Sequence, residues 1–215
     1  MGVCSVTDTA IMPIFPLPTV VFPGQVLPLH IFEDRYRVMI ARCRETNPDE
    51  FPGSNRFVVV LGTGPHMFSI GCVVELIRVV TEYPDGRLDI LTRGVERVAL
   101  RNLRSGQPYA RGSVEPLPDV SDGGHAGPLR EQVLALATRL TELLCREPII
   151  LGIPPDEPAA YRLASLAGLD LSARQKLLET RSERERLTQV REALRRTLAH
   201  GLGEAPSPDP SMLVN

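Results

Sequence analysis

Lys176 is the only lysine in the chain, and it limits the chemistry that the sequence can perform. A nucleotide-binding P-loop needs a lysine directly after a glycine-rich turn, whereas Lys176 follows Gln175 in a charged helical pattern. A Ser-Lys protease needs a lysine beside a serine nucleophile, and no nucleophile motif lies near Lys176. We therefore expect this side chain to be solvated, and we predict that the chain is not an enzyme.

The histidines and cysteines are spaced too widely to predict a metal site or a disulfide framework. They lie at His30, His66, His125 and His200, and at Cys4, Cys43, Cys72 and Cys145. Cys72 precedes two valines, so we interpret it as a small core residue rather than a nucleophile. A hydrolase would need Cys72 or a serine within hydrogen-bond reach of His30 or His66. We expect no metal ion and no cofactor.

Two other polar segments have structural interpretations. Glu33 and Asp34 precede a helical pattern, where the helix dipole stabilises negative charge, so they indicate a helix start rather than an acid-base pair. The segment 62–70 has glycines near a strand end, but it lacks the third glycine of a dinucleotide-binding fingerprint and no helix follows it. We predict a flexible loop there.

Three apolar side chains on predicted loops are the candidate protein- or peptide-binding residues. Met67 and Phe68 lie between Gly64 and Gly71, and Phe51 lies in another stretch rich in Pro and Gly. Apolar residues on loops mark partner sites more often than an average surface does. The alternative, in which these side chains fold back onto the core, stays open.

The composition is that of an ordinary globular protein. The 215 residues are 43% apolar and 23% charged, with a formal net charge of −2, so no overall field favours nucleic acid or an anionic membrane. No apolar run reaches the length of a membrane span, and the N-terminus lacks a signal core. We expect a cytoplasmic protein with reduced cysteines and no membrane contact.

Short apolar and β-branched runs predict six or seven strands in the first half of the chain. They lie near residues 11–17, 25–29, 56–61, 71–81, 87–92, 95–104 and 109–115. Five prolines between residues 13 and 28 restrict the first strands to short, kinked pieces, which suit a small barrel. The sequence Pro84-Asp85-Gly86 predicts a hairpin turn between two later strands.

One amphipathic helix interrupts these strands, and several helices follow them. The first has an apolar stripe at Tyr36, Met39, Ile40 and Cys43. A second, starting near Leu129, has an apolar face at Leu129, Val133, Leu136, Ala137, Leu140, Leu143 and Leu144. Ser172 with Gln175, and Ser182 with Glu185, fit capping boxes of two later helices. The last helix has a stripe at Leu187, Val190, Leu194 and Leu198, and we expect its charged face, within 181–196, to be solvated.

The stretch between Leu117 and Pro128 is rich in Gly and Pro and poor in apolar residues, so it predicts a domain boundary. We predict an α+β fold with three parts. They are a PUA-like β-barrel domain with one inserted helix (10–118), a helical bundle domain (128–201) and a disordered tail (204–215).

Several segments, in this order and spacing, resemble the N-terminal substrate-binding domain of Lon proteases. They are Pro16-Leu-Pro-Thr-Val-Val-Phe-Pro-Gly-Gln-Val-Leu-Pro-Leu29, Gly71-Cys-Val-Val-Glu-Leu76, the Asp85-Gly86 turn with Leu91-Thr-Arg-Gly-Val-Glu-Arg97, and Leu177-Leu-Glu-Thr-Arg-Ser-Glu-Arg-Glu-Arg-Leu187. The resemblance implies a PUA-like β pseudo-barrel followed by a C-terminal α-helical bundle, and a role in substrate recognition. In Lon the ATPase and Ser-Lys protease domains follow this region, and the resemblance does not include them. We therefore expect a stand-alone, non-catalytic module.

The first functional hypothesis is an adaptor or quality-control protein that binds exposed apolar segments of polypeptide clients, or a protease or chaperone partner. The alternative is an RNA-binding PUA-like protein, against which the net charge and the 5% aromatic content argue. A weak self-association stays open, and we expect neither membrane nor nucleic acid as a partner.

Overall fold

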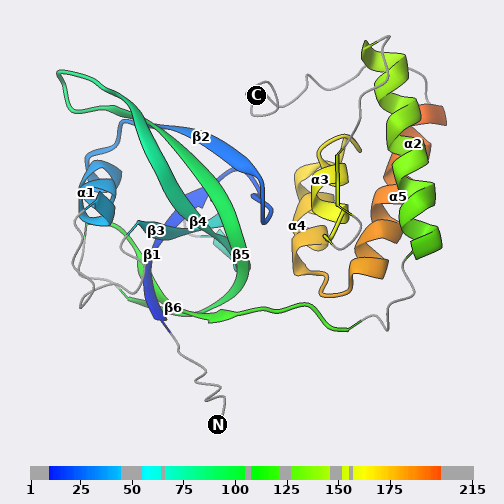
Figure 1. Cartoon of the computed structure of the whole chain (residues 1–215). Coiled ribbons are helices and arrows are strands. Elements are labelled where there is room, and N and C mark those ends of the chain that lie inside the picture. Colours follow the sequence, from blue (N-terminus) through cyan, green and yellow to red (C-terminus); the bar gives the residue numbers. More distant parts are fainter. Residues whose placement is uncertain are drawn as a thin grey trace, which may run out of the picture. The chain divides into compact units, whose positions relative to one another are not determined.

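The computed structural model describes residues 10–44, 55–63, 66–104, 108–121, 127–145, 152–154 and 157–199 (Figure 1). The chain divides into two compact units, the first ending at Leu117 and the second starting at Pro118. The predicted domain limits 10–118 and 128–201 remain predictions, and the predicted tail 204–215 lies outside the described residues.

The first unit is built on a mixed sheet of six strands. These are β1 (Ala10–Leu17), β2 (Val26–Ile31), β3 (Arg56–Thr63), β4 (His66–Glu82), β5 (Leu88–Arg104) and β6 (Arg111–Pro116). Their order is β2-β5-β4-β3-β1-β6, and β6 also pairs with β5. Only the β1–β3 pair is parallel among the pairings of the described strands. The predicted α+β fold class is confirmed.

Two predicted strands, 87–92 and 95–104, form the single strand β5, so the predicted break at Gly94 is wrong. A glycine is needed at position 94 because another backbone segment lies against it. Its N–H donates to the carbonyl oxygen of Gln25 (2.8 Å), and its own carbonyl accepts from Gly24 N (2.8 Å). A Cβ on Gly94 would overlap with the carbonyl oxygen of Phe22. The missing side chain permits this approach without ending the strand.

Helix α1 (Asp34–Arg44) covers one side of the sheet. Its predicted apolar stripe is confirmed, because Tyr36, Met39, Ile40 and Cys43 are buried. They belong to a core cluster that also contains residues of β2, β4 and β5, namely Ile31, Leu76, Leu88 and Ile90. A second cluster lies among the paired strands, formed by Met12, Ile14, Val58, Val60, Val73, Val98, Leu100 and Val114. The predicted hairpin turn is confirmed by Gly86, whose φ is 83° and whose N–H donates to Tyr83 O (2.8 Å).

The second unit is helical. Its elements are α2 (Gly127–Cys145), α3 (Ala160–Ala164), α4 (Leu171–Glu179) and α5 (Glu183–Ala199). Three of the four predicted stripe residues of α5 are fully buried, while Leu198 is half-buried. On α2 the buried stripe is Val133, Ala137 and Leu140. The predicted apolar face is wrong at Leu143 and Leu144, which are exposed at the helix end, beyond the last turn that other apolar groups cover.

The two predicted capping boxes have different outcomes. Ser182 caps α5 as predicted, because its hydroxyl accepts from Glu185 N (3.1 Å). The prediction for Ser172 is wrong, since Asp170 caps α4 by accepting from Ala173 N (2.7 Å). Asp170 stands one residue before the first helical position, where the free N–H groups point at its carboxylate. None of the described helices is both long and apolar enough to cross a membrane.

Candidate protein-binding surface

A three-stranded arm, formed by β2, residues 76–82 of β4 and residues 88–93 of β5, ends in the hairpin turn at 83–87 (Figure 1). Side chains along a strand alternate between its two sides. On the inner side, Ile31, Val79 and Ile90 pack against the core cluster beneath α1. The opposite side, which we call the outer face, is formed by Val26, Pro28, His30, Phe32, Ile77, Arg78, Val80, Thr81, Asp89, Leu91 and Arg93.

The register of the arm places these residues in rows across the three strands. His30 on β2 is paired with Asp89 on β5, and Asp89 is paired with Thr81 on β4. In the next row, Pro28 is paired with Leu91, which is paired with Arg78. Directly opposed side chains in such rows lie about 5 Å apart at Cβ. The outer face is therefore one continuous surface of three strands.

Two β-bulges bring additional apolar residues onto this surface. The β4–β5 register shifts between Leu76 and Arg78 and again between Val79 and Thr81, so that Ile77 and Val80 are extra residues on β4. A bulge sets two residues against one on the partner strand. Ile77 thus lies beside Arg78 opposite Leu91, and Val80 lies beside Thr81 opposite Asp89. Their side chains are 41% and 56% exposed.

A polar and aromatic cluster lies on the outer face near the C-terminal end of β2. The Nδ1 of His30 lies 2.6 Å from one carboxylate oxygen of Asp89, and the Tyr83 hydroxyl donates to the other (2.7 Å). The hydrogen bond with His30, then that with Tyr83, lowers the pKa of Asp89 below its ordinary value. The His30 ring stacks on Phe32 with a centroid distance of 6.1 Å. Phe32, which is 62% exposed, therefore lies on the same side as His30.

Both edges of the arm are protected against the addition of another strand. Gly94 N donates to Gln25 O, so the backbone of Gln25 points toward β5. Backbone groups alternate along an antiparallel strand, and those of Leu27 and Leu29 therefore also point toward β5. Pro28 and its neighbours at 26 and 30 then face the free edge, where Pro28 offers no N–H. The other edge, residues 76–82 of β4, carries the two bulges. Proline and bulges both hinder strand pairing, so contacts here depend on side chains.

Comparison with known proteins identifies the family. Residues 11–196 match the family model described as the ATP-dependent protease La (LON) substrate-binding domain. This chain belongs to that family. A crystal structure of a Lon N-terminal domain protein from Xanthomonas campestris is 26% identical, with a TM-score of 0.60, and covers 84% of this chain and 96% of that one. The N-terminal domain of Mycobacterium avium complex Lon protease has the same fold, with a TM-score of 0.64 at 18% identity over 86% of this chain and 98% of that one.

The curated relatives are much longer than this chain. The Lon protease of Porphyromonas gingivalis is 24% identical over 187 residues, and that of Dictyoglomus thermophilum is 26% identical over 205 residues. These matches cover 81% and 87% of this chain, but only 22% and 24% of the two proteases. The chain thus spans about a quarter of their length and corresponds to the substrate-binding domain of Lon, not to its catalytic domain.

The structure describes two of the three binding residues that the sequence predicts. Phe51 lies outside the described residues. Met67 and Phe68 lie near the start of β4, and residues 62 and 63 end β3, so the loop predicted over 62–70 is wrong in both strands. Met67 is half-buried against the second core cluster, while Phe68 is 47% exposed. A role of any of these residues in binding stays a prediction.

The sequence analysis missed Phe32, Ile77 and Val80. The alternation Pro28, His30, Phe32 was a signal for the first of them, because it continues the outward side of β2. No such signal exists for Ile77 and Val80, since a bulge changes the phase of β4 within an unbroken apolar run.

The buried cysteines are inert by their surroundings. Burial raises the pKa of Cys72 to about 12, and its thiol donates to Val73 O (3.3 Å). Burial likewise raises the pKa of Cys43 to about 12. Both thiols are protonated at neutral pH and so are poor nucleophiles. Within the described part of the chain, no three His, Cys, Asp or Glu side chains gather as a metal site would require.

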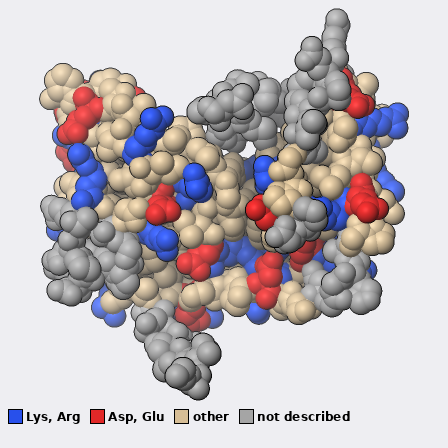
Figure 2. Space-filling model, viewed as in Figure 1, with Lys and Arg blue, Asp and Glu red and all other residues tan. Residues whose placement is uncertain are grey.

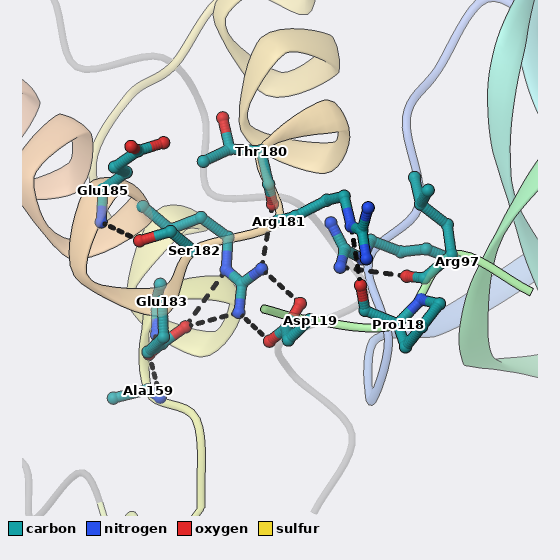
Figure 3. A network of polar contacts seen from close by, with 12 residues as sticks. Arg97, Pro118, Asp119, Ala159, Thr180, Arg181, Ser182, Glu183 and Glu185 are labelled. Carbon is teal, nitrogen blue, oxygen red and sulfur yellow. Dashed lines mark hydrogen bonds and ion pairs between the residues drawn. The ribbon is translucent and has the colours of Figure 1, made fainter. Parts of the chain in front are cut away.

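A polar cluster in the second unit is centred on Arg186, which is fully buried. Figure 3 labels three residues of this cluster, Asp119, Thr180 and Glu183. Its guanidinium donates to both carboxylate oxygens of Asp119, to Glu183 through Nε (3.0 Å) and Nη2 (2.8 Å), and to Thr180 O (2.9 Å). It also lies over the Tyr161 ring, 4.6 Å from the centroid. Burial by itself lowers the pKa of Arg186, but the hydrogen bond to Asp119 and the surrounding negative charge raise it overall.

All five guanidinium donors of Arg186 are used within the protein. The other carboxylate oxygen of Glu183 accepts from the backbone N–H groups of Ala159 and Ala160 (2.8 and 2.9 Å) at the start of α3. The prediction of a solvated charged face over 181–196 is therefore wrong at Arg186. The cluster holds three segments of the helical unit together and has no donor left for a ligand, so its role is structural.

Proposed function

We propose that this member of the Lon substrate-binding family is a non-catalytic module that binds exposed apolar segments of polypeptide clients through the outer face of the arm. One observation carries the proposal: Phe32, which follows β2, and Ile77 and Val80 of β4 are between 41% and 62% exposed on one face of the three-stranded arm, with β5 between the two strands. Exposed apolar groups that gather on one face are typical of protein-binding sites, whereas singly scattered ones are normal on any surface.

The expected affinity follows from the size of this surface. Full burial of one Val- or Phe-sized side chain stabilises a complex by about 1.5–3 kcal/mol. The favourable free energy from three such side chains is offset in part by the entropy that the client loses on binding. Binding is therefore weak and reversible, which suits a protein that samples many clients.

The family relationship supports this function, because the matching domain is named for substrate binding. We propose a role as an adaptor in cytoplasmic protein quality control that presents clients to a protease or chaperone partner. Phe68 and Met67, near the start of β4, are a second proposed contact, and Phe51, outside the described residues, is a further proposed binding residue. In the view of Figure 2, arginine side chains are interspersed with Asp and Glu rather than gathered in one stripe, which argues against the RNA-binding alternative.

The test is binding of an unfolded model protein, reduced and carbamidomethylated α-lactalbumin, beside its native form. The variant Phe32→Ala/Val80→Ser is expected to lose most of the binding to the unfolded form. Leu143→Ala is the matched control, because Leu143 is 52% exposed, close to the values for Phe32 and Val80, but lies in the second unit. Full binding by the outer-face variant, with loss in Met67→Ala/Phe68→Ala, would move the site to the start of β4.

A further inference from the structure

The charged groups of the outer face differ in how much of their bonding capacity is used. Asp89 is occupied by His30 and Tyr83. Glu75, which is paired in register with Arg93, accepts from Asn55 Nδ2 (3.1 Å). Asp89 and Glu75 therefore already have hydrogen-bond donors.

The two arginines of the outer face are in the opposite situation. Arg78 and Arg93 are exposed, and neither forms an ion pair or hydrogen bond with another side chain among the described residues. Arg78 lies opposite Leu91, and Arg93 is two residues from Leu91 along β5. Since neighbouring positions on one side of a strand are about 7 Å apart, both cations flank the same apolar residue.

The surface thus combines uncovered apolar side chains with cations that have no carboxylate partner. An arginine can donate two parallel hydrogen bonds to a carboxylate, which gives geometric selectivity as well as attraction. A purely apolar client would leave both guanidinium groups without a partner at the rim of the contact. A client with a carboxylate between its apolar side chains would satisfy them.

We infer that the outer face selects client segments in which an Asp or Glu lies between apolar side chains, and that it reads them through side chains rather than by strand addition. The inference rests on the proposed function, because it names the substrate class of the same surface. Phe32 and Val80 supply contact area for any apolar segment. Arg78 and Arg93 supply the discrimination between acidic and neutral segments.

The experiment is fluorescence anisotropy with two labelled peptides of about ten residues. In both, Leu and Phe alternate with Ser around a central pair, which is Asp-Asp in one peptide and Asn-Asn in the other. We expect the Asp peptide to bind about fivefold more tightly, as partly exposed ion pairs contribute modestly. The preference should shrink as salt is raised, because exposed charges are screened.

The variant Arg78→Gln/Arg93→Gln is expected to bind the two peptides equally, at the affinity of the wild type for the Asn peptide. Arg139→Gln is the matched control, since Arg139 is an exposed arginine of α2 in the second unit. Its preference for the Asp peptide should be unchanged. Thermal unfolding of each variant shows whether the fold is intact.

The outcomes separate the inference from the proposed function. Equal binding of both peptides by the wild type, or a preference that persists in the double variant, overturns the inference and leaves the proposed function standing. Absence of binding to either peptide overturns both. Tighter binding of a labelled oligouridine, lost in the double variant, would assign the two arginines to nucleic acid. Dimers in sedimentation that Phe32→Ala abolishes would assign the surface to a second copy of the chain.

Discussion

The outer face of the arm and the Arg186 cluster use the same side chain in opposite ways. Arg78 and Arg93 are exposed without a carboxylate partner among the described residues, whereas Arg186 is buried with every donor occupied. A buried charge is tolerated only when its surroundings satisfy it completely, so it is committed to the fold. An exposed charge without a partner contributes little to stability and is free to select a ligand. Burial and pairing together therefore distinguish structural arginines from recognition arginines.

The largest effect that tests this contrast is expected for Arg186→Ala. Removing the guanidinium leaves Asp119 and Glu183, whose side chains are 38% and 18% exposed, beside each other without a cation. Breaking a fully buried pair typically costs about 3–5 kcal/mol, and solvent screening of the two carboxylates reduces the expected loss to about 2–3 kcal/mol. Urea unfolding of the whole chain measures the loss. Arg195→Ala is the control, because Arg195 forms only a surface ion pair with Glu192 and should change the free energy of unfolding by less than about 1 kcal/mol. Equal effects of the two substitutions would contradict the structural role of Arg186.

A second large effect is expected for the alkylation of the buried Cys72 thiol. A pKa of about 12 for Cys72, against an ordinary value of 9.0, lowers the thiolate fraction about 1000-fold at pH 8. Iodoacetamide should therefore leave Cys72 unmodified in the folded protein and alkylate it in urea, as followed by peptide mass spectrometry. Rapid alkylation in the native state would show that this strand opens readily.

On the outer face, Phe32→Ala should separate binding from stability. We expect a loss of about tenfold in affinity for the unfolded model protein, because a large apolar contact is removed. The melting temperature should be nearly unchanged, since the ring is 62% exposed. A fall in the melting temperature with unchanged affinity would place Phe32 in the fold rather than in recognition.

The smallest expected effect is a pH dependence from Asp89. Its pKa is lowered in the folded state, so its stabilising contribution is present above the ordinary value of 3.8 and is lost as the pH falls through the folded pKa. Asp89→Asn should lower the melting temperature slightly at pH 7, and the difference from the wild type should vanish toward pH 2. Scanning fluorimetry across this range measures it. A difference that persists in acid would mean that the charge of Asp89 is not the cause.

Local patterns predicted the fold class and most elements, because hydrophobic periodicity and turn residues report on short-range structure. For this reason the sequence predicted the buried stripe of α1, the turn at Gly86 and the Ser182 cap correctly. Gly94 was misread because its role depends on a backbone 70 residues earlier in the chain. Arg186 was misread because the residues around it in the sequence have the charge pattern of a solvated helix face, whereas its partner Asp119 is far away in the sequence.

The candidate surface was harder to predict than the fold for a related reason. Two bulges decide that Ile77 and Val80 point outward, and bulges have no sequence pattern in a continuous β-branched run. Met67 and Phe68 were predicted together from one loop, but strand alternation sends one of them toward the core and leaves the other exposed.

Under the proposed function, Pro28 and the bulges of β4 have a consequence for how unfolded chains are bound. An unfolded client carries its own β-prone segments, and an open sheet edge would template their stacking into insoluble assemblies. An arm with a proline on one edge and irregular pairing on the other can hold such a segment by its side chains without nucleating its growth. The client then leaves as a single chain, still available for refolding or degradation.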